Sequence, residues 1–281
     1  MDDESKRAIG GVLQAIQRNS GYLARQEIES LLAGYRADPK RLEPFGRKIY
    51  SQNDEDGIIE EIFRRLGIEN GTFCEIGVEN GLECNSLYLL HKGWRGVWVD
   101  GDQSREAFIK AKFESLIARG RLALAINIMT AENINPLLEH PSLGVQEFDF
   151  LSIDIDGNDI HLLRAVRSRP KVLCIEYNAK WPPTIRKAPV YDPQYVWTGS
   201  DYMGSSLAAL NDVAVDKGYR LVGTNITGAN AFFVRADLAA DRFADDASPE
   251  ALYNPPRYWL LMDHFWHIGH RADFGAYEDL V

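Results

Sequence analysis

The stretch Phe73-Cys-Glu-Ile-Gly-Val-Glu-Asn-Gly81 is followed about twenty residues later by Gly96-Val-Trp-Val-Asp100. Each stretch is a short apolar run that ends in an acid, and a glycine turn follows the first acid. This pattern is typical of the first two strands of a doubly wound α/β sheet. There the glycines let the backbone approach a nucleotide, and the second acid accepts hydrogen bonds from ribose hydroxyls. The two stretches predict an adenosine-binding half with Asp100 as the ribose acid.

The spacing of the glycines indicates which adenosine ligand is bound. A dinucleotide fingerprint reads Gly-x-Gly-x-x-Gly, whereas this chain reads Glu75-x-Gly77-x-x-x-Gly81. The wider spacing suits a ligand that has no pyrophosphate to place at a helix N-terminus. We therefore expect S-adenosylmethionine, with Glu75, Gly77 and Gly81 among the residues that bind it, rather than NAD.

Composition limits the other classes. The chain has 281 residues, 45% of them hydrophobic, which is enough for one large core. Its net charge of -10 disfavours a nucleic-acid partner, because phosphate binding needs a basic face. No apolar run approaches the roughly 18 residues of a membrane span, and the first residues lack the pattern of a signal peptide. We expect a cytoplasmic protein whose partner is a small molecule.

Three cysteines are present, an odd number, and two of them lie within predicted buried strands. Reduced core thiols fit this pattern better than a disulfide framework or a zinc site does. No catalytic role is assigned to Cys74, Cys84 or Cys174.

Apolar periodicity predicts an α/β fold with a mainly parallel sheet and an antiparallel final hairpin. The expected strands are 72–76, 96–99, 122–127, 148–153, 172–177, 219–224 and 231–235, with a helix over 54–66. Residues 1–45 form an N-terminal helical extension, a cap or dimer contact, before a binding domain over 46–240. Residues 241–281 form a helical, histidine-rich tail. The proline-rich segment from Trp181 to Trp197 is an insertion at the carboxyl edge of the sheet, where ligands bind.

Acidic residues end two neighbouring predicted strands. Asp154 and Asp156 follow the fourth strand, and Glu176 and Asn178 follow the fifth. Oxygen ligands of this kind are preferred by Mg²⁺, Mn²⁺ or Ca²⁺, so these four residues are candidate metal ligands. In the alternative, the two aspartates orient the cofactor or cap the next helix, and Glu176 bonds a backbone amide.

Methyl transfer from a sulfonium needs an aligned acceptor that can lose a proton. The candidate catalytic residues are Asp154, His161 and Lys180. A divalent ion on the acceptor hydroxyl would lower its pKa, so that a weak base suffices. For both His161 and Lys180, a structural or solvated role is the alternative.

Three further segments have two interpretations each. Thr130, Ala131 and Glu132 follow the third strand and are candidates to line the adenine, or else Thr130 and Asn133 cap a helix. Ser205 and Ser206 either hold a polar group of the acceptor or cap the helix that follows. The histidines of the tail either bind a metal or pack structurally; they are His264, His267 and His270.

Several of these motifs together resemble the FkbM-type S-adenosylmethionine-dependent methyltransferases. They are Ser51-Gln-Asn-Asp-Glu-Asp-Gly-Ile-Ile, the stretch from Phe73 to Gly81, Asn85-Ser-Leu-Tyr-Leu-Leu, Lys92-Gly-Trp-Arg-Gly and Ser152-Ile-Asp-Ile-Asp-Gly. The resemblance spans about Tyr50 to Arg235. It implies a Rossmann-like class I methyltransferase sheet and an oxygen acceptor on a sugar or another small metabolite. It also implies cofactor roles for Glu75, Gly77, Gly81, Asp100 and Asp154.

The chain is therefore expected to be a homodimeric S-adenosylmethionine-dependent methyltransferase. Its expected acceptor is a sugar or a small hydroxylated metabolite, and Mg²⁺ or Mn²⁺ is the candidate metal that assists it. Two alternatives stay open. One is an NAD-dependent or nucleotide-sugar enzyme, and the other is a catalytically silent adenosyl-binding module that works through its helical extensions.

Overall fold

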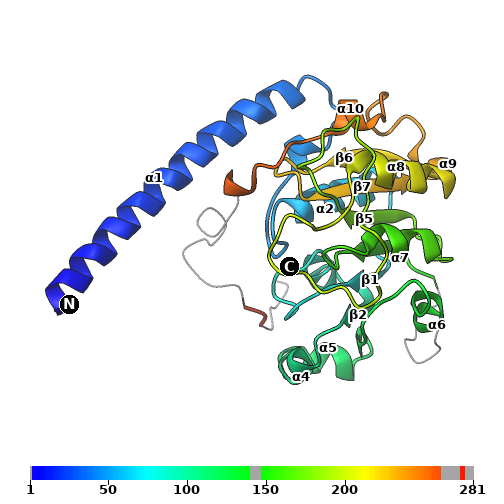
Figure 1. The fold of residues 1–281 in the computed structure, drawn as a ribbon, viewed down its shortest axis with the longest axis horizontal. Coiled ribbons are helices and arrows are strands. Elements are labelled where there is room, and N and C mark those ends of the chain that lie inside the picture. Colours follow the sequence, from blue (N-terminus) through cyan, green and yellow to red (C-terminus); the bar gives the residue numbers. More distant parts are fainter. Residues whose placement is uncertain (1, 140–146, 261–272, 276–281) are drawn as a thin grey trace.

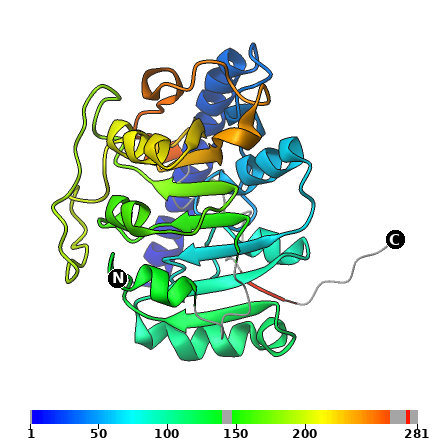
Figure 2. The same ribbon diagram turned by 90° about the vertical axis from the view of Figure 1, so that its right-hand side faces the viewer.

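The computed structural model describes residues 2–139, 147–260 and 273–275. Within them, seven strands form one sheet in the order β3-β2-β1-β4-β5-β7-β6 (Figures 1 and 2). The strands are β1 Thr72–Ile76, β2 Arg95–Asp100, β3 Leu122–Ile126, β4 Phe150–Ile153, β5 Val172–Glu176, β6 Tyr219–Thr224 and β7 Asn230–Arg235. The first five run parallel to their neighbours, and β7 runs antiparallel to both β5 and β6. The predicted Rossmann-like sheet with an antiparallel final hairpin is confirmed.

Helices cover both faces of the sheet. The main helices are α2 Glu55–Leu66, α3 Leu87–His91, α4 Glu106–Lys112, α5 Glu114–Ala118, α6 Ile134–Leu138, α7 Asp159–Ala165, α8 Leu207–Asp216, α9 Ala236–Ala239 and α10 Pro249–Leu252. One apolar core joins α2 to α5 with Phe73, Trp98 and Phe150 of the sheet. The other core joins α6, α7 and α8 with the alternate residues of the same strands, such as Ile76 and Leu151. Because strand side chains alternate between faces, each strand contributes to both cores.

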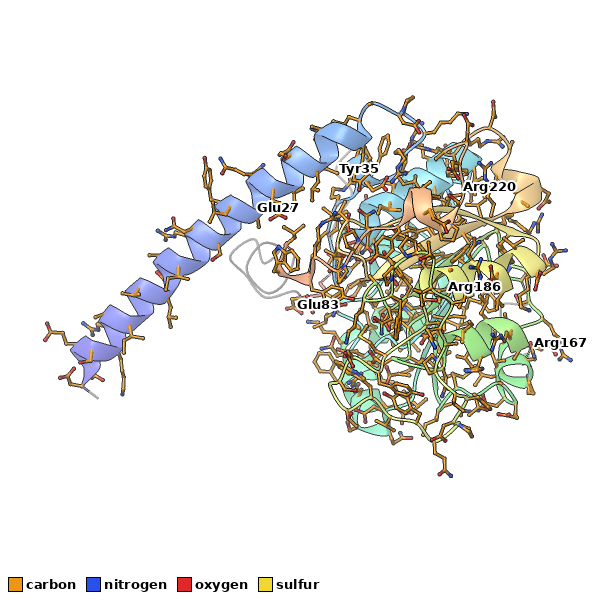
Figure 3. The ribbon with its side chains drawn as sticks, turned by 45° about the horizontal axis from the view of Figure 1, so that its top comes forward. Glu27, Tyr35, Glu83, Arg167, Arg186 and Arg220 are labelled. Carbon is orange, nitrogen blue, oxygen red and sulfur yellow. The ribbon has the colours of Figure 1, made fainter. Side chains whose placement is uncertain are left out.

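The predicted N-terminal extension is one helix, α1 Asp3–Tyr35, rather than several. Figure 1 shows it projecting from the body, and Figure 3 shows Tyr35 close to the body and Glu27 farther out along the helix. Its last turns pack through Ile28 and Leu32 on Ile226 and Leu260. Ile9, Val12, Leu13 and Ile16 stay about half exposed. The predicted cap or dimer role of this helix stays a prediction.

Among the described residues, no helix is both long enough and apolar enough to cross a membrane. All three cysteines are free and buried, as expected for core thiols.

Candidate active site

The polar residues that end the strands lie on one face of the sheet. Residues two apart along a strand share a face, and Phe73, Trp98, Phe150 and Cys174 all belong to the core on the α2 side. Their neighbours two to four positions further along therefore point to that same side at the carboxyl edge. These neighbours are Glu75, Asp100, Asp154 and Glu176.

Glu75 holds the loop that follows β1. It is 3% exposed, and its carboxylate accepts hydrogen bonds from the backbone N–H of Asn85 at 2.7 Å and of Ser86 at 2.8 Å, and from the Ser86 hydroxyl at 2.5 Å. Burial raises the pKa of Glu75 to about 7. Through these bonds the Glu75 side chain fixes the end of the predicted cofactor loop, between β1 and α3.

Gly77 and Gly81 both have positive φ, at 89° and 78°. A Cβ on Gly77 would lie 1.7 Å from the backbone oxygen of Asp154, and a Cβ on Gly81 would lie 2.6 Å from the Trp98 ring. The two predicted glycines are therefore required for close packing of the loop as well as for its backbone conformation. Glu79 between them also has positive φ, at 52°, a conformation that costs energy for a residue with a side chain.

Asp100 lies at the end of β2, where the sequence predicts the ribose acid. Its carboxylate accepts from the backbone N–H of Glu79 at 2.7 Å and of Asp102 at 2.8 Å. The guanidinium of Arg105 lies 3.5 Å away. A carboxylate offers about four lone-pair positions, so these bonds leave room for a ribose hydroxyl.

The segment after β3 forms the predicted helix cap, and its predicted contact with adenine stays a prediction. Thr130 and Asn133 form a reciprocal cap, with the Thr130 N–H donating to Asn133 Oδ1 and the Asn133 N–H donating to Thr130 Oγ1. Next to this cap, the Ala131 N–H donates to the Tyr191 hydroxyl at 3.0 Å, and that hydroxyl donates to the Glu132 carboxylate. An N–H donor beside a carboxylate acceptor also complements the N1 and N6 edge of adenine.

Three carboxylates converge where β4 and β5 end. Oxygen atoms of Asp154, Asp156 and Glu176 lie within 4.8 Å of one another. Glu176 is 8% exposed, and its Oε2 has no hydrogen-bond partner. Burial, together with the charges of neighbouring carboxylates, raises the pKa of both Asp154 and Glu176 well above the ordinary range. Among the described residues, no positively charged group stabilises the ionised form of these three acids.

The loop that carries Asp156 is held by another acid. Asp159 accepts from the backbone N–H of Ile155 and of Gly157, both at 2.9 Å. Asp156 itself adopts φ of 55°, so its backbone is held in an unfavourable conformation. Asp159 thus fixes this loop, and the alternative in which Asp154 and Asp156 orient the cofactor or cap the next helix stays a prediction.

Asn178 is engaged elsewhere. Its Nδ2 donates to the backbone oxygens of Asp201 at 2.9 Å and of Met203 at 2.7 Å, and its Oδ1 accepts from the Lys180 N–H at 3.2 Å. Asn178 lies two residues beyond the end of β5, and its amide holds the segment around Asp201 and Met203 against that strand end. Both the nitrogen and the oxygen of this side chain bond the loop, and the predicted ligand role of Asn178 stays a prediction.

His161 and Lys180, the predicted bases, both contact the proline-rich insertion or its flanks. The Nε2 of His161 bonds the Pro189 oxygen at 2.9 Å, so this nitrogen carries a proton, and the ring lies against Tyr191. Lys180 is exposed and forms an ion pair with Asp201. Both side chains have a structural task, and their catalytic role stays a prediction.

The insertion itself spans several strand ends. Besides the Tyr191 and Pro189 contacts, Asp192 accepts through its backbone oxygen from Asn158 at 2.8 Å. The ring of Tyr195 lies against Gly157, where a Cβ would come within 2.7 Å of it. Figure 2 shows this segment as the long yellow-green excursion at the left of the view. We call this proline-rich insertion, from Trp181 to Trp197, the strap. The sequence placed the strap at the ligand edge of the sheet but did not single out Tyr191, since an aromatic residue in a proline-rich loop gives no periodic signal.

The remaining predicted sites are Ser205 and Ser206 before α8 and the histidines of the tail. Ser206 caps α8, because its hydroxyl accepts from the Ala209 N–H at 3.3 Å. Ser205 is fully buried and its hydroxyl has no partner. The predicted histidine site at His264, His267 and His270 lies outside the described residues.

We expect the stability of the protein to fall as pH rises. Burial, then the charge of Glu55, raises the pKa of Asp54 to about 8, and burial raises that of Asp56 to about 6. The folded state holds these protons more tightly than the unfolded state, so their stabilisation is complete below about pH 4 and is lost as pH rises through 6 to 8. Urea unfolding at pH 5 and pH 8 should show a loss of about 5 kcal/mol from the two groups together.

Asp54→Asn should reduce this loss, whereas Glu139→Gln, an exposed residue paired with Arg167, should leave it unchanged. An equal pH dependence in Asp54→Asn and the parent chain would show that Asp54 does not titrate in this range.

No protein-family model and no curated protein sequence matches the chain. Among solved structures, an O-methyltransferase from Bacillus cereus in complex with SAH is 16% identical. That match covers 75% of this chain and 88% of the other, with a TM-score of 0.40. A TehB-like SAM-dependent methyltransferase from Corynebacterium glutamicum is 13% identical over 75% of this chain and 99% of its own, with a TM-score of 0.39. At this similarity we take the function from the geometry of the site.

Proposed function

We propose that the chain is an S-adenosylmethionine-dependent methyltransferase that methylates an oxygen of a sugar or another small hydroxylated metabolite, with a divalent cation at the acceptor end of the site. The observation that supports this most is the arrangement of polar groups along one sheet edge. Adenosine-compatible groups follow β1, β2 and β3, and a group of acids that lacks a counter-charge follows β4 and β5. This order matches a ligand that stretches from an adenine to a reacting sulfonium. The FkbM resemblance of the sequence supports the same proposal.

The cofactor fits the residues of the first half. Asp100 is placed to accept from the ribose, and the Ala131 N–H and Glu132 carboxylate suit an adenine edge. The positive φ of Gly77 brings the loop backbone against β4 without a side chain in between. The helix after this loop starts only at Leu87 and has 5 residues. No helix N-terminus therefore follows the glycine turn directly, which disfavours the pyrophosphate of NAD.

A divalent cation fits the residues of the second half. Hard oxygen ligands are present in Asp154, Asp156 and Glu176, and a buried carboxylate oxygen without a partner calls for a positive charge. A cation there would lower the pKa of an acceptor hydroxyl. The chain's own contribution is to fix the three carboxylates, through Asp159 and the β4–β5 pairing, and to cover the edge with the proline-rich strap.

Calorimetric titration with S-adenosylmethionine and S-adenosylhomocysteine, each with Mg²⁺ and after chelation, tests the proposal. We expect binding of both, and tighter binding with the cation. Absence of binding under every condition would remove the methyltransferase proposal. Binding without turnover of any hydroxylated acceptor would favour a silent adenosyl-binding module.

Replacing Tyr191 by phenylalanine should tighten cofactor binding. The change frees the Ala131 N–H and the Glu132 carboxylate, which the Tyr191 hydroxyl otherwise occupies. One net hydrogen bond corresponds to about 0.5–1.5 kcal/mol, so the Kd for S-adenosylhomocysteine should fall by about 2- to 10-fold. Tyr202→Phe is the control, because the Tyr202 hydroxyl also bonds the strap, where it accepts from the Val190 N–H. Weaker binding by Tyr191→Phe would instead make this hydroxyl part of the cofactor site.

A further inference from the structure

Asn230 begins β7 directly opposite Glu176 of β5. The ladder bonds on either side identify the type of pair. The Tyr177 N–H donates to the Ala229 oxygen at 2.9 Å, and the Arg235 N–H donates to the Lys171 oxygen at 2.9 Å. Residues 177 and 171 are therefore in hydrogen-bonded pairs, and position 176, which lies between such pairs, is in a non-hydrogen-bonded pair. Side chains approach most closely in pairs of this kind, and opposite residues share a face of the sheet.

The orientation of the Asn230 amide is fixed by Glu55. Asn230 Nδ2 donates to Glu55 Oε1 at 2.9 Å, and Asn225 Nδ2 donates to the same oxygen at 2.8 Å. Glu55 is fully buried, and its Oε1 accepts from both amides. The amide nitrogen of Asn230 must therefore face Glu55, which turns its oxygen away.

Within the part of the chain that the structure describes, that oxygen has no partner. Asn230 is 4% exposed, and its Oδ1 makes no hydrogen bond, like the Oε2 of Glu176 on the facing strand. Two buried acceptors thus stand on one face of a close cross-strand pair without a donor for either. A buried acceptor without a partner costs about 1–3 kcal/mol, and a positive ligand would satisfy both at once.

We infer that Asn230 supplies, through Oδ1, a further oxygen ligand of the divalent-cation site formed by Asp154, Asp156 and Glu176, and that Glu55 is the residue that positions it. This inference rests on the proposed cation site and extends it to the antiparallel strand. A neutral amide oxygen added to three carboxylates gives the all-oxygen set that Mg²⁺, Mn²⁺ and Ca²⁺ accept.

Titration of the full chain with Mn²⁺, followed by calorimetry and by the loss of the free-Mn²⁺ paramagnetic resonance signal, tests the inference without any need for a substrate. Asn230→Ala should weaken Mn²⁺ binding by about 10-fold, consistent with the loss of one neutral ligand. Asn211→Ala is the matched control. Its Oδ1 also lacks a partner, but it lies on α8, which covers the opposite face of the sheet. This control should bind Mn²⁺ as the parent chain does.

Asn230→Asp separates a ligand from a structural residue. The added charge faces Glu55 and Glu176, so the variant should unfold at a lower temperature without metal. If Oδ1 is a ligand, the same variant should bind Mn²⁺ more tightly and regain the lost stability when Mn²⁺ is added. If the amide serves only Glu55, neither gain appears and the inference is overturned.

The Mn²⁺ titrations distinguish failure of the Asn230 inference from failure of the proposed cation site. Mn²⁺ binding by the parent chain with unchanged affinity in Asn230→Ala overturns the Asn230 inference and leaves the three-carboxylate site in place. No Mn²⁺ binding by the parent chain overturns the cation site itself. Should Asn230→Ala not fold, the Asn230→Asp comparison still decides the question.

Discussion

Gly77→Ala is expected to destabilise the protein by about 3 kcal/mol or more, a large fraction of the stability of an ordinary domain. Its Cβ would lie 1.7 Å from the Asp154 backbone oxygen, and neither the β1 turn nor β4 can move without breaking the sheet. The strained φ of 89° adds to this collision. Urea unfolding followed by circular dichroism measures the loss.

Gly120→Ala provides the matched control. Gly120 also has positive φ, at 66°, but no atom lies within 4 Å of its would-be Cβ. It should therefore lose only about 1 kcal/mol through backbone strain. Equal losses in the two variants would mean that the contact between the glycine loop and β4 does not restrict the backbone.

Glu176→Gln is expected to weaken divalent-cation binding by about 100-fold while it makes the metal-free protein more stable by about 1–2 kcal/mol at pH 8. The substitution keeps the shape of a buried side chain and removes a charge that faces Asp154 and Asp156. Opposite effects on stability and binding are typical of a residue retained for function. Urea unfolding in EDTA and calorimetry with Mn²⁺ measure the two quantities.

Glu75→Gln should have the opposite effect on stability. Glu75 lies on the same face and is equally buried, but its oxygens accept from Asn85 and Ser86. A glutamine there would set an amide N–H₂ against those donors, so the variant should lose about 2 kcal/mol and keep its cation affinity. If both glutamine variants lose stability, Glu176 has a stabilising contact and its carboxylate is not held for a cation.

The sequence was sufficient to predict the elements of the sheet. All seven strands lie within two residues of their predicted ends, because each is an apolar run bounded by turn residues. The edge on which Asp100, Asp154 and Glu176 gather also follows from the parallel order, since parallel strands end on the same side.

Contacts between distant segments could not be predicted in this way. Tyr191 meets Ala131 across 60 residues, and Asn230 meets Glu55 across 175. Neither pair leaves a periodic trace in the sequence. Asn178 was selected as a ligand because it follows β5, yet the loop after it takes both ends of its amide. The polar residues that follow each strand therefore identified the edge of the sheet, but they did not reveal which contacts the amide side chains make there.

The reversed direction of β7 has a consequence for how this protein can diverge. Because β7 starts where the parallel strands end, the turn from Asn225 to Asn230 lies at the same edge of the sheet as Glu176. This turn is closed by Asn225, whose Oδ1 accepts from the Ala229 and Asn230 N–H groups. Its length and chemistry can change while the five parallel strands keep their register. A change confined to this hairpin tip would therefore alter the sheet edge beside Glu176 and leave β1, β2 and β3 as they are.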